Sequence, residues 1–329
     1  MNRKRVAVIY GGRSGEHEIS LLSAESVIAA INAMDPPQYE VVRYFIGKDG
    51  RWNPRPILPQ PGAHPDIDVV FPLVHGTFGE DGTLQGLFEL ADLPYVGANV
   101  LASALSMDKD MMKRVCRDGG LPVVAYKVVS REEIQTGAAA FDFPFPMFVK
   151  PANLGSSVGI SKAHNEAELK EALRVAAEFD SKVIVEQGIE GREFECSVMG
   201  NEDPEAAMPC EILPSREFYD YEDKYVLNKA RIVLPPDLLK HEILEIRSLA
   251  VECYKAVGCE GMARVDFLRE ASTSKIYVNE INTIPGFTAI SMFPKMWEYC
   301  GVKYSDLIDR LIQLALDRYA ARKATRFTR

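Results

Sequence analysis

The sequence predicts an α/β protein that joins a parallel-sheet domain at the N-terminus to α+β regions further along the chain. The chain has 329 residues, which is more than one hydrophobic core usually serves. Strand-like and helical segments alternate over the first hundred residues, as in parallel sheets covered by helices. Strand-like runs dominate from about residue 190. We therefore expect three domains, spanning residues 1–105, 106–190 and 191–329.

The N-terminal domain begins with "RVAVIYGG", a short β-branched run that ends in two glycines and reads as a buried strand. The pattern then predicts helices over 21–34 and 82–93 and strands over 39–47 and 68–74. Ligands of such sheets bind at the carboxyl ends of the strands, so residues 11–18 and 75–82 should meet at one edge.

The central region is predicted from helical and apolar periodicity. Asn165, with Glu168 three residues later, is a good N-cap for a helix. The predicted helices cover 104–120 and 165–179, and the strands cover 123–130, 145–152 and 181–189.

Beyond residue 190, strands are expected over 192–200, 206–214, 261–270 and 274–282, with a final helix over 304–323. Between them lies "SREFYDYEDKYVLNKAR", a polar, tyrosine-rich segment that reads as a long surface loop.

Composition narrows the class of protein. A net charge of −9 argues against nucleic acid as a partner, although it allows a local basic pocket. The six cysteines form no CxxC pair and match no zinc-ligand spacing, so we expect them to be reduced and mostly buried. No apolar run is long enough for a signal-peptide core or a membrane span, which predicts a cytoplasmic protein that does not bind membranes.

A polar patch is predicted on the hairpin formed by the last two strands. Alternate residues of a strand share a face, so Arg264 and Asp266 point to one side. A turn centred near Thr273 would place Asp266 opposite Glu280 and Arg264 opposite Asn282. Oxygen ligands without histidine or cysteine suit Mg²⁺, but a solvated salt-bridge face is an equally ordinary explanation.

The stretch "FVKPANLGSSVGISK" places Lys150 before a loop of small residues whose backbone can approach a ligand closely. Lys109 is a second candidate. Each lysine alone is more often a surface residue than a ligand. No GxxxxGK[ST] motif is present, so a standard P-loop is excluded.

Several long segments, in order, resemble the ATP-grasp superfamily and within it the D-alanine–D-alanine ligases. They are "GGRSGEHEIS", "HGTFGEDGTLQG", "LSMDK", "FVKPANLGSSVGISK", "FYDYEDKY", "ARVDF" and "NEINTIPGFT". The resemblance covers nearly the whole chain and implies a three-domain ATP-grasp fold. It also implies two Mg²⁺ ions, with Mn²⁺ as an alternative and K⁺ as an activator, and a homodimer.

The resemblance assigns roles to individual residues. Catalytic roles fall to Glu16, Ser156, Tyr225, Arg264 and Gly286. ATP would be bound by Lys109, Lys150, Ser156, Ser157, Glu186, Gln187, Ile189, Glu193 and Lys224. The amino acid substrates would be bound by Glu16, His75, Ser291 and Met292, and Lys224 would also lie near the second substrate. The metal ligands would be Asp266, Glu280 and Asn282.

The implied reaction joins two D-alanines through an acyl phosphate, with ATP as the phosphoryl donor, for peptidoglycan precursor synthesis. A ligase that joins D-alanine to D-lactate, or another ATP-grasp carboxylate–amine ligase, is the alternative enzyme. Tyr225 in "YDYEDKY" favours the dipeptide ligase. A nucleotide-binding relative without turnover is disfavoured because every charged residue of the site is present. Gln187-Gly188 departs from the lysine–aromatic pair that many family members carry.

Overall fold

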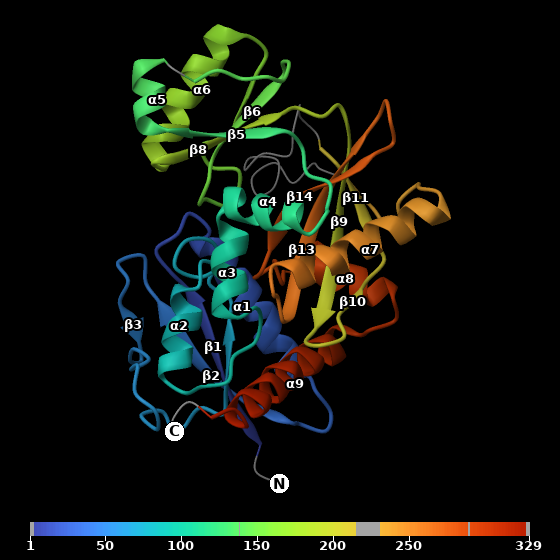
Figure 1. The fold of residues 1–329 in the computed structure, drawn as a ribbon. Coiled ribbons are helices and arrows are strands. Elements are labelled where there is room, and N and C mark those ends of the chain that lie inside the picture. The colour runs from blue at the N-terminus through green and yellow to red at the C-terminus, as the bar shows by residue number, and fades with distance from the viewer. Residues whose placement is uncertain (1–2, 138, 215–230, 289, 327–329) are drawn as a thin grey trace.

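The computed structural model describes residues 3–137, 139–214, 231–288 and 290–326. These residues form three sheets with helices packed against them (Figure 1). The tyrosine-rich loop, with Lys224 and Tyr225, lies outside the described residues.

The N-terminal sheet is parallel at its centre, as predicted. Strand β1 (Lys4–Gly11) pairs in parallel with β2 (Tyr39–Ile46) and β4 (Val69–Pro72), and the short β3 (Trp52–Asn53) adds an antiparallel edge. Helix α1 (His17–Asn32) begins four residues earlier than predicted. Its first turn carries Ser20, whose hydroxyl accepts from the Gly11 amide and donates to the Leu73 carbonyl at the strand ends.

The predicted helix over 104–120 is wrong as a single element. After α2 (Thr83–Leu90), the chain forms α3 (Val100–Met107) and α4 (Lys109–Asp118), separated at Asp108. The Asp108 carboxylate accepts hydrogen bonds from the backbone amides of residues 110 and 111 and so begins a new helix. Aspartate favours this N-cap position over a helix interior.

The second sheet is antiparallel and has the order β5-β8-β6-β7. Helix α6 packs against it, and its N-cap Asn165 accepts from the Glu168 amide at 3.0 Å, as predicted. The short polar helix α5 was not predicted. The elements are β5 (Tyr126–Ser130), α5 (Arg131–Thr136), β6 (Met147–Pro151), β7 (Ser161–Ala163), α6 (Glu166–Phe179) and β8 (Lys182–Gln187).

The third sheet is antiparallel, with β9 at its centre between β11 and β13. The predicted strand over 206–214 divides into two. Helix α7 (Lys240–Ala256) was not predicted, and it buries Ile246 and Ala250 in the core beside this sheet. The strands are β9 (Gly191–Gly200), β10 (Glu205–Ala206), β11 (Cys210–Leu213), β12 (Arg231–Val233), β13 (Gly261–Glu270) and β14 (Ile276–Asn282).

The C-terminal helices complete the core of the N-terminal sheet. After α8 (Met292–Tyr299), helix α9 (Tyr304–Lys323) lies beside α1 and β4 (Figure 1). Its buried Leu307 and Leu311 belong to the same hydrophobic cluster as Val8 of β1 and Phe71 of β4. Residues about 300 positions apart in the sequence therefore share one core.

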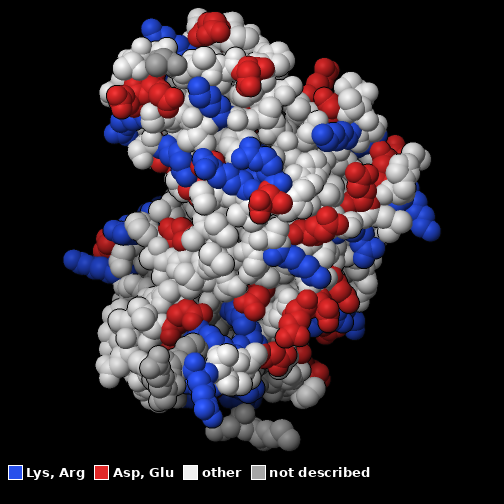
Figure 2. Space-filling model, in the orientation of Figure 1, with Lys and Arg blue, Asp and Glu red and all other residues white. Residues whose placement is uncertain are grey.

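The cysteines are free thiols, and all except the exposed Cys300 are buried, as predicted. No helix in the described parts of the chain has the length and apolarity needed to cross a bilayer. Figure 2 shows basic side chains gathered in a band just below the second sheet, although the whole chain is acidic.

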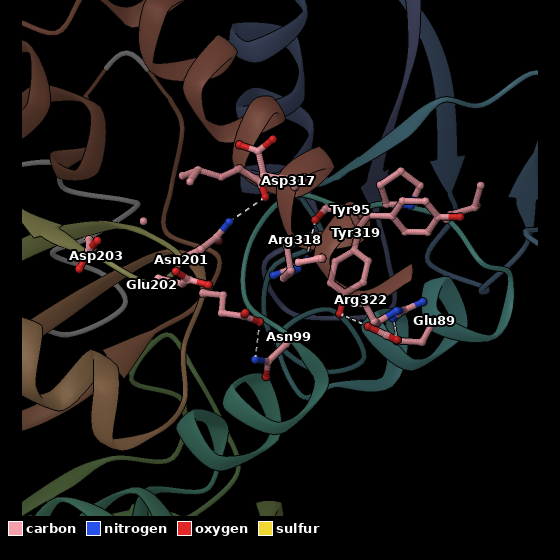
Figure 3. Close-up of a pocket in the computed structure, with 17 residues that line it drawn as sticks. Glu89, Tyr95, Asn99, Asn201, Glu202, Asp203, Asp317, Arg318, Tyr319 and Arg322 are labelled. Atoms are coloured by element: carbon pink, nitrogen blue, oxygen red, sulfur yellow. Dashed lines mark hydrogen bonds and ion pairs between the residues drawn. The ribbon is translucent and has the colours of Figure 1, made fainter. Parts of the chain in front are cut away.

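A cavity of about 580 Å³ lies where α9 meets the 89–99 segment and the turn after β9 (Figure 3). Arg318 packs over the Tyr95 ring at 4.4 Å and donates to the Tyr95 and Gly97 carbonyls. Arg322 pairs with Glu89. These contacts fasten α9 to the N-terminal sheet, and no residue assigned a role in the sequence lines this cavity.

Candidate active site

The hairpin of β13 and β14 has the predicted register. Asp266 lies opposite Glu280, and Arg264 lies opposite Asn282. A bulge follows Asp266, so the pairing of the two strands shifts by one residue only between Asp266 and the turn near Thr273. The sequence therefore placed the four polar side chains correctly on one face.

Arg264 is held between carboxylates. Its Nε and Nη2 each donate to Asp266 at 2.7 Å, and Nε lies 3.1 Å from Glu195 Oε2 on β9. Burial lowers the pKa of the guanidinium, but Asp266 and then Glu195 outweigh burial and hold that pKa well above its ordinary value. The bonds to Asp266 use Nε and Nη2 and leave Nη1 out. The side chain is therefore charged, fixed in place, and able to donate one more set of hydrogen bonds.

The chemistry of the patch suits a hard cation. Asp266 also accepts from Asn282 Nδ2 at 3.0 Å, so these two side chains touch. Across the described ranges, no three or more histidine, cysteine, aspartate or glutamate side chains are grouped to hold a metal. The patch instead offers two carboxylates, Asp266 and Glu280, and one amide oxygen, a donor set that fits Mg²⁺ bound together with phosphate oxygens.

Both predicted lysines point inward. Lys109, the first residue of α4, is 6% exposed, and its Nζ donates to the Leu154 carbonyl at 2.6 Å. Lys150 on β6 is 9% exposed and lies 2.7 Å from Glu186 Oε2. Its Nζ also donates to Asn279 Oδ1 on β14 at 3.4 Å. Lys150 therefore links the serine loop to the strand that carries Glu280.

Lys113 is a site residue that the sequence analysis missed. It is fully buried, and its Nζ lies 3.0 Å from Glu186 Oε1 and donates to the Asn279 carbonyl at 3.3 Å. The signal was available, because Lys113 stands four residues after Lys109 and so shares one face of the helix with it.

Glu186, which the resemblance assigns to ATP binding, turns its carboxylate into the interior. The side chain is 2% exposed and lies between the two lysine ammonium groups. Gln187 and Gly188 donate their amides to Ala125 and Pro146, which fixes the end of β8. A ligand at this strand end would therefore meet main-chain atoms of Glu186 and not its carboxylate.

The ion pairs of Glu186 make stability depend on acid pH. Burial raises the pKa of Glu186, but Lys113 and Lys150 outweigh it and lower the pKa to about 2. The ionised Glu186 carboxylate stabilises the folded state fully above its unfolded-state pKa of about 4.3, and this stabilisation is lost as pH falls toward 2. Between pH 5 and 3, the free energy of unfolding should fall by about 2 kcal/mol more in the wild type than in Lys113→Met/Glu186→Gln. Urea titrations at both pH values measure the difference, and equal losses would contradict it.

The serine loop has a constrained backbone. Ser156 and Ser157 adopt φ values of 54° and 57°, in the left-handed region that non-glycine residues seldom occupy. Ser156 Oγ is buried and bonds to none of the described residues. The resemblance also implies a hydrogen-bonded set of Glu16, Ser156 and Tyr225. The Ser156 hydroxyl makes no bond to Glu16 in this structure, and Tyr225 lies outside the described residues. Glu16 lies instead over Gly155, where an added Cβ would stand 3.3 Å from Glu16 Oε2.

His75 connects the N-terminal sheet to the turn after β14. Its Nδ1 lies 3.0 Å from the Ile284 carbonyl and its Nε2 lies 3.0 Å from Ser23 Oγ. Burial lowers the pKa of His75, but Glu80 and then Glu16 raise it above its ordinary value. Ser14 Oγ donates to the His75 carbonyl at 2.7 Å, so the two predicted loops do meet at one edge.

The turn also brings Gly286 close to Ser291. An added Cβ on Gly286 would lie 2.6 Å from Ser291 Oγ, so a larger residue would displace that hydroxyl. Ser291 Oγ accepts from the Thr288 amide at 3.0 Å. Met292 follows as the first residue of α8 and is packed against the core. Burial lowers the pKa of Lys150, but Glu186 and then Glu280 and Glu193 raise it, so Glu193 on β9 lies near this lysine.

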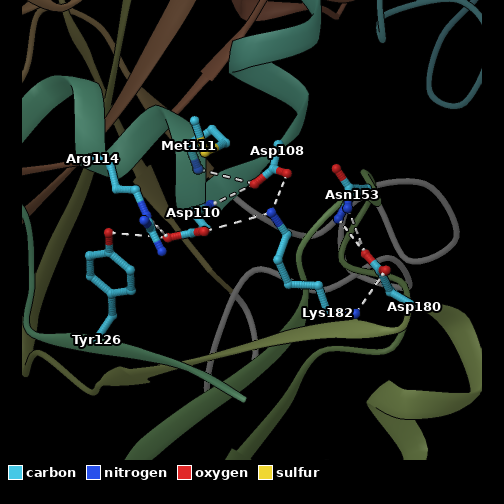
Figure 4. Close-up of polar contacts among 8 residues, drawn as sticks. All are labelled: Asp108, Asp110, Met111, Arg114, Tyr126, Asn153, Asp180 and Lys182. Carbon is cyan, nitrogen blue, oxygen red and sulfur yellow. Dashed lines mark hydrogen bonds and ion pairs between the residues drawn. The ribbon is translucent and has the colours of Figure 1, made fainter. Parts of the chain in front are cut away.

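A network of polar contacts anchors α4 to the second sheet (Figure 4). Lys182 of β8 pairs with Asp108 and lies 3.6 Å from Asp110. Asp110 also pairs with Arg114 at 2.7 Å and accepts from the Tyr126 hydroxyl of β5 at 3.4 Å. Lys109 and Lys113 therefore project from a helix that is held at its first turn.

Two family models match the chain. The one described as "D-ala D-ala ligase C-terminus" matches residues 115–313, and the one described as "D-ala D-ala ligase N-terminus" matches residues 5–64 and 53–98. Among curated proteins, a D-alanine–D-alanine ligase of Solibacter usitatus is 64% identical, with 99% of each chain covered. D-alanine–D-alanine ligase A of Escherichia coli is 43% identical, with 100% of each chain covered.

Solved structures share the fold. The D-alanine–D-alanine ligase of Coxiella burnetii superposes with a TM-score of 0.84 at 38% identity, covering 98% of this chain and 97% of that one. The VanG D-Ala:D-Ser ligase of Enterococcus faecalis gives a TM-score of 0.86 at 35% identity, covering 95% and 100%.

Proposed function

Because this chain belongs to the D-alanine–D-alanine ligase family, we propose that the site described above is where it joins two D-alanines. The protein is an ATP-dependent ligase of the ATP-grasp fold that makes D-alanyl-D-alanine for peptidoglycan precursor synthesis. The observation that carries the site assignment is the contact of Lys150 with β14. It puts a buried cation from the serine-loop strand beside the carboxylate patch.

The lysines and the serine loop would bind the phosphates of ATP. Lys109 and Lys150 would neutralise phosphate charge from two sides, and the loop with Ser156 and Ser157 would cover the phosphates. The unbonded Ser156 hydroxyl and the left-handed backbone support this role, because strained backbone is often kept at ligand sites. The adenine would lie at the end of β8, against main-chain atoms of Glu186, Gln187 and Ile189, with Glu193 near the ribose.

Asp266, Glu280 and Asn282 would hold Mg²⁺, and the family implies two ions, with Mn²⁺ as a substitute and K⁺ as an activator. When bound, Mg²⁺ supplies positive charge to the phosphate oxygens during phosphoryl transfer. The all-oxygen donor set of the patch supports Mg²⁺ over softer metals.

The reaction then needs positioning and charge stabilisation more than covalent catalysis by the protein. The carboxylate of the first D-alanine attacks the γ-phosphate of ATP and gives an acyl phosphate and ADP. The amine of the second D-alanine attacks the acyl carbon, and phosphate leaves. Nη1 of Arg264 and the amide of Gly286 would donate to the oxyanion of the tetrahedral intermediate.

The substrates would lie between the N-terminal sheet and the turn after β14. Glu16 would bind the ammonium group of the first D-alanine, and His75 would hold this side of the pocket to the turn. Ser291 and Met292 would lie near the carboxylate of the second D-alanine. Lys224 and Tyr225 carry family roles but lie outside the described residues.

Product analysis tests the choice of second substrate. With ATP, Mg²⁺ and equal D-alanine, D-serine and D-lactate near neutral pH, we expect D-alanyl-D-alanine to dominate and ADP release to require D-alanine. A reaction without D-alanine is the control. Dominant D-alanyl-D-lactate or D-alanyl-D-serine would overturn the dipeptide assignment, and no ADP release under any condition would overturn the enzyme assignment.

The remaining expectations concern organisation. We propose three domains spanning 1–105, 106–190 and 191–329, a cytoplasmic location, and a homodimer. Leu22 on α1 is 59% exposed while the opposite face of the helix is buried, so this helix is one candidate dimer surface. Light scattering coupled to size exclusion measures the oligomeric state, and a monomer at micromolar concentration would contradict the dimer.

A further inference from the structure

Three side chains from different elements form a buried ion cluster behind the proposed phosphate site. Lys113 comes from α4, Lys150 from β6, and Glu186 from β8. Glu186 Oε1 lies 3.0 Å from Lys113 Nζ, and Oε2 lies 2.7 Å from Lys150 Nζ. One carboxylate is therefore shared by two ammonium groups, one on each oxygen.

The two lysines differ in their freedom. Lys113 is fully buried, its side chain is 1% exposed, and it also donates to a main-chain carbonyl. The side chain of Lys150 is 11% exposed and starts from the strand that leads into the serine loop. Lys150 can turn toward a phosphate, whereas Lys113 stays in the interior.

Helix α4 holds Lys113 in place. The contacts of Asp108 and Asp110 with Lys182 fasten the first turn of the helix to β8, the strand that carries Glu186 (Figure 4). The separation between Lys113 and Glu186 is therefore set by rigid elements and not by a loop.

The role of the cluster follows from the balance of its charges. If Lys150 moved to a phosphate and Glu186 had no other partner, a carboxylate buried to 2% exposure would be left without a counter-ion. An unpaired buried charge is strongly unfavourable. With Lys113 in place, Glu186 remains paired whether Lys150 faces inward or outward.

We infer that Lys113 is a positioning residue for ATP binding: it keeps Glu186 neutralised so that Lys150 can exchange between that carboxylate and the phosphates of ATP. The inference rests on the proposed function only in taking Lys150 as a phosphate ligand. Lys113 itself does not touch the nucleotide.

Calorimetric titration with Mg·ATP in the absence of D-alanine, together with KM values for ATP and D-alanine, tests the inference. Lys113→Met should weaken ATP binding about 10- to 100-fold, the usual range for coupled sites, and leave the KM for D-alanine within about 3-fold. Lys113→Met/Glu186→Gln should bind ATP within about 3-fold of Glu186→Gln alone, because no buried carboxylate is then stranded. Lys127→Met is the matched control, since Lys127 stands on β5 of the same sheet, donates to the Ala140 carbonyl and lies opposite Val185, one register position from Glu186. It should bind ATP like the wild type.

Several outcomes would overturn the inference. ATP binding by Lys113→Met within about 3-fold of the wild type would show that Lys113 has no such role. If Lys113→Met/Glu186→Gln binds ATP as weakly as Lys113→Met, the loss comes from altered packing and not from the unpaired carboxylate. If Lys113→Met does not fold, Lys113→Gln replaces it, because glutamine keeps a polar side chain at this position but carries no charge. If the wild-type protein binds ATP but shows no D-alanine-dependent turnover, the proposed function is wrong. The ATP-binding measurements on the variants then decide this inference by themselves.

Discussion

Replacing Arg264 with alanine will lower kcat by about 10² or more, the usual loss when an oxyanion donor is removed. The guanidinium is held between Asp266 and Glu195, and N–H groups that these contacts do not use, those of Nη1 among them, remain for a substrate oxygen. Its removal takes away that donor and leaves two carboxylates without their cation. Steady-state kinetics at saturating ATP and D-alanine measure the effect.

Arg269→Ala is the matched control, because this arginine stands on the same strand and lies 2.6 Å from Glu242 in a similarly buried pair. It should lose stability in the same way but keep its kcat within about 3-fold. An Arg264→Ala enzyme with unchanged kcat, or a control with an equal loss, would remove Arg264 from the oxyanion site.

Glu280→Gln will raise the Mg²⁺ concentration needed for half-maximal activity by about 100-fold. Mutating a residue that only hydrogen-bonds to a metal ligand typically lowers the metal affinity by about 10- to 100-fold. Loss of a direct ligand should therefore reach the upper end of this range. Loss of the carboxylate halves the anionic donors of the patch, because Asn282 supplies only a neutral oxygen. Activity measured against free Mg²⁺ at constant Mg·ATP gives the shift.

Glu270→Gln provides the comparison for this second experiment. Glu270 stands on β13 at the turn end of the same hairpin and bonds to Thr273, far along the strands from Asp266. Its substitution should leave the Mg²⁺ dependence unchanged. If Glu280→Gln also shows wild-type Mg²⁺ dependence, the patch is a salt-bridge face and the metal lies elsewhere.

The hairpin could be predicted because its geometry is local. Strand alternation and a turn near Thr273 fix which side chains share a face. The bulge comes after Asp266, so it does not change the pairing of Arg264 and Asp266 with β14. The parallel N-terminal sheet was predictable for a similar reason, since strand and helix alternate along the sequence. These features depend on periods of two and 3.6 residues, which a single sequence displays.

The Glu186 cluster could not be predicted from such patterns. Its members are 37 and 36 residues apart in the sequence. The pairing of β6 with β8 brings Lys150 to Glu186, and the position of α4 adds Lys113. The break between α3 and α4 at Asp108 was missed for a local reason. Helical periodicity continues through it, and only the capping bonds of a single carboxylate decide that a new helix begins.

The packing of α9 against β4 and α1 also bears on how the chain folds during synthesis. Roughly 240 residues separate Phe71 from Leu311, and at elongation rates of about 5–20 residues per second they take roughly 10–50 s to synthesise. During that time Val6, Val8 and Phe71 lack the helix that covers them in the finished core. Until α9 is synthesised, α1 covers part of this face of the N-terminal sheet and the rest stays exposed. Protection of that face from aggregation, by a chaperone or by the ribosome surface, becomes part of what the cell must supply to make this enzyme.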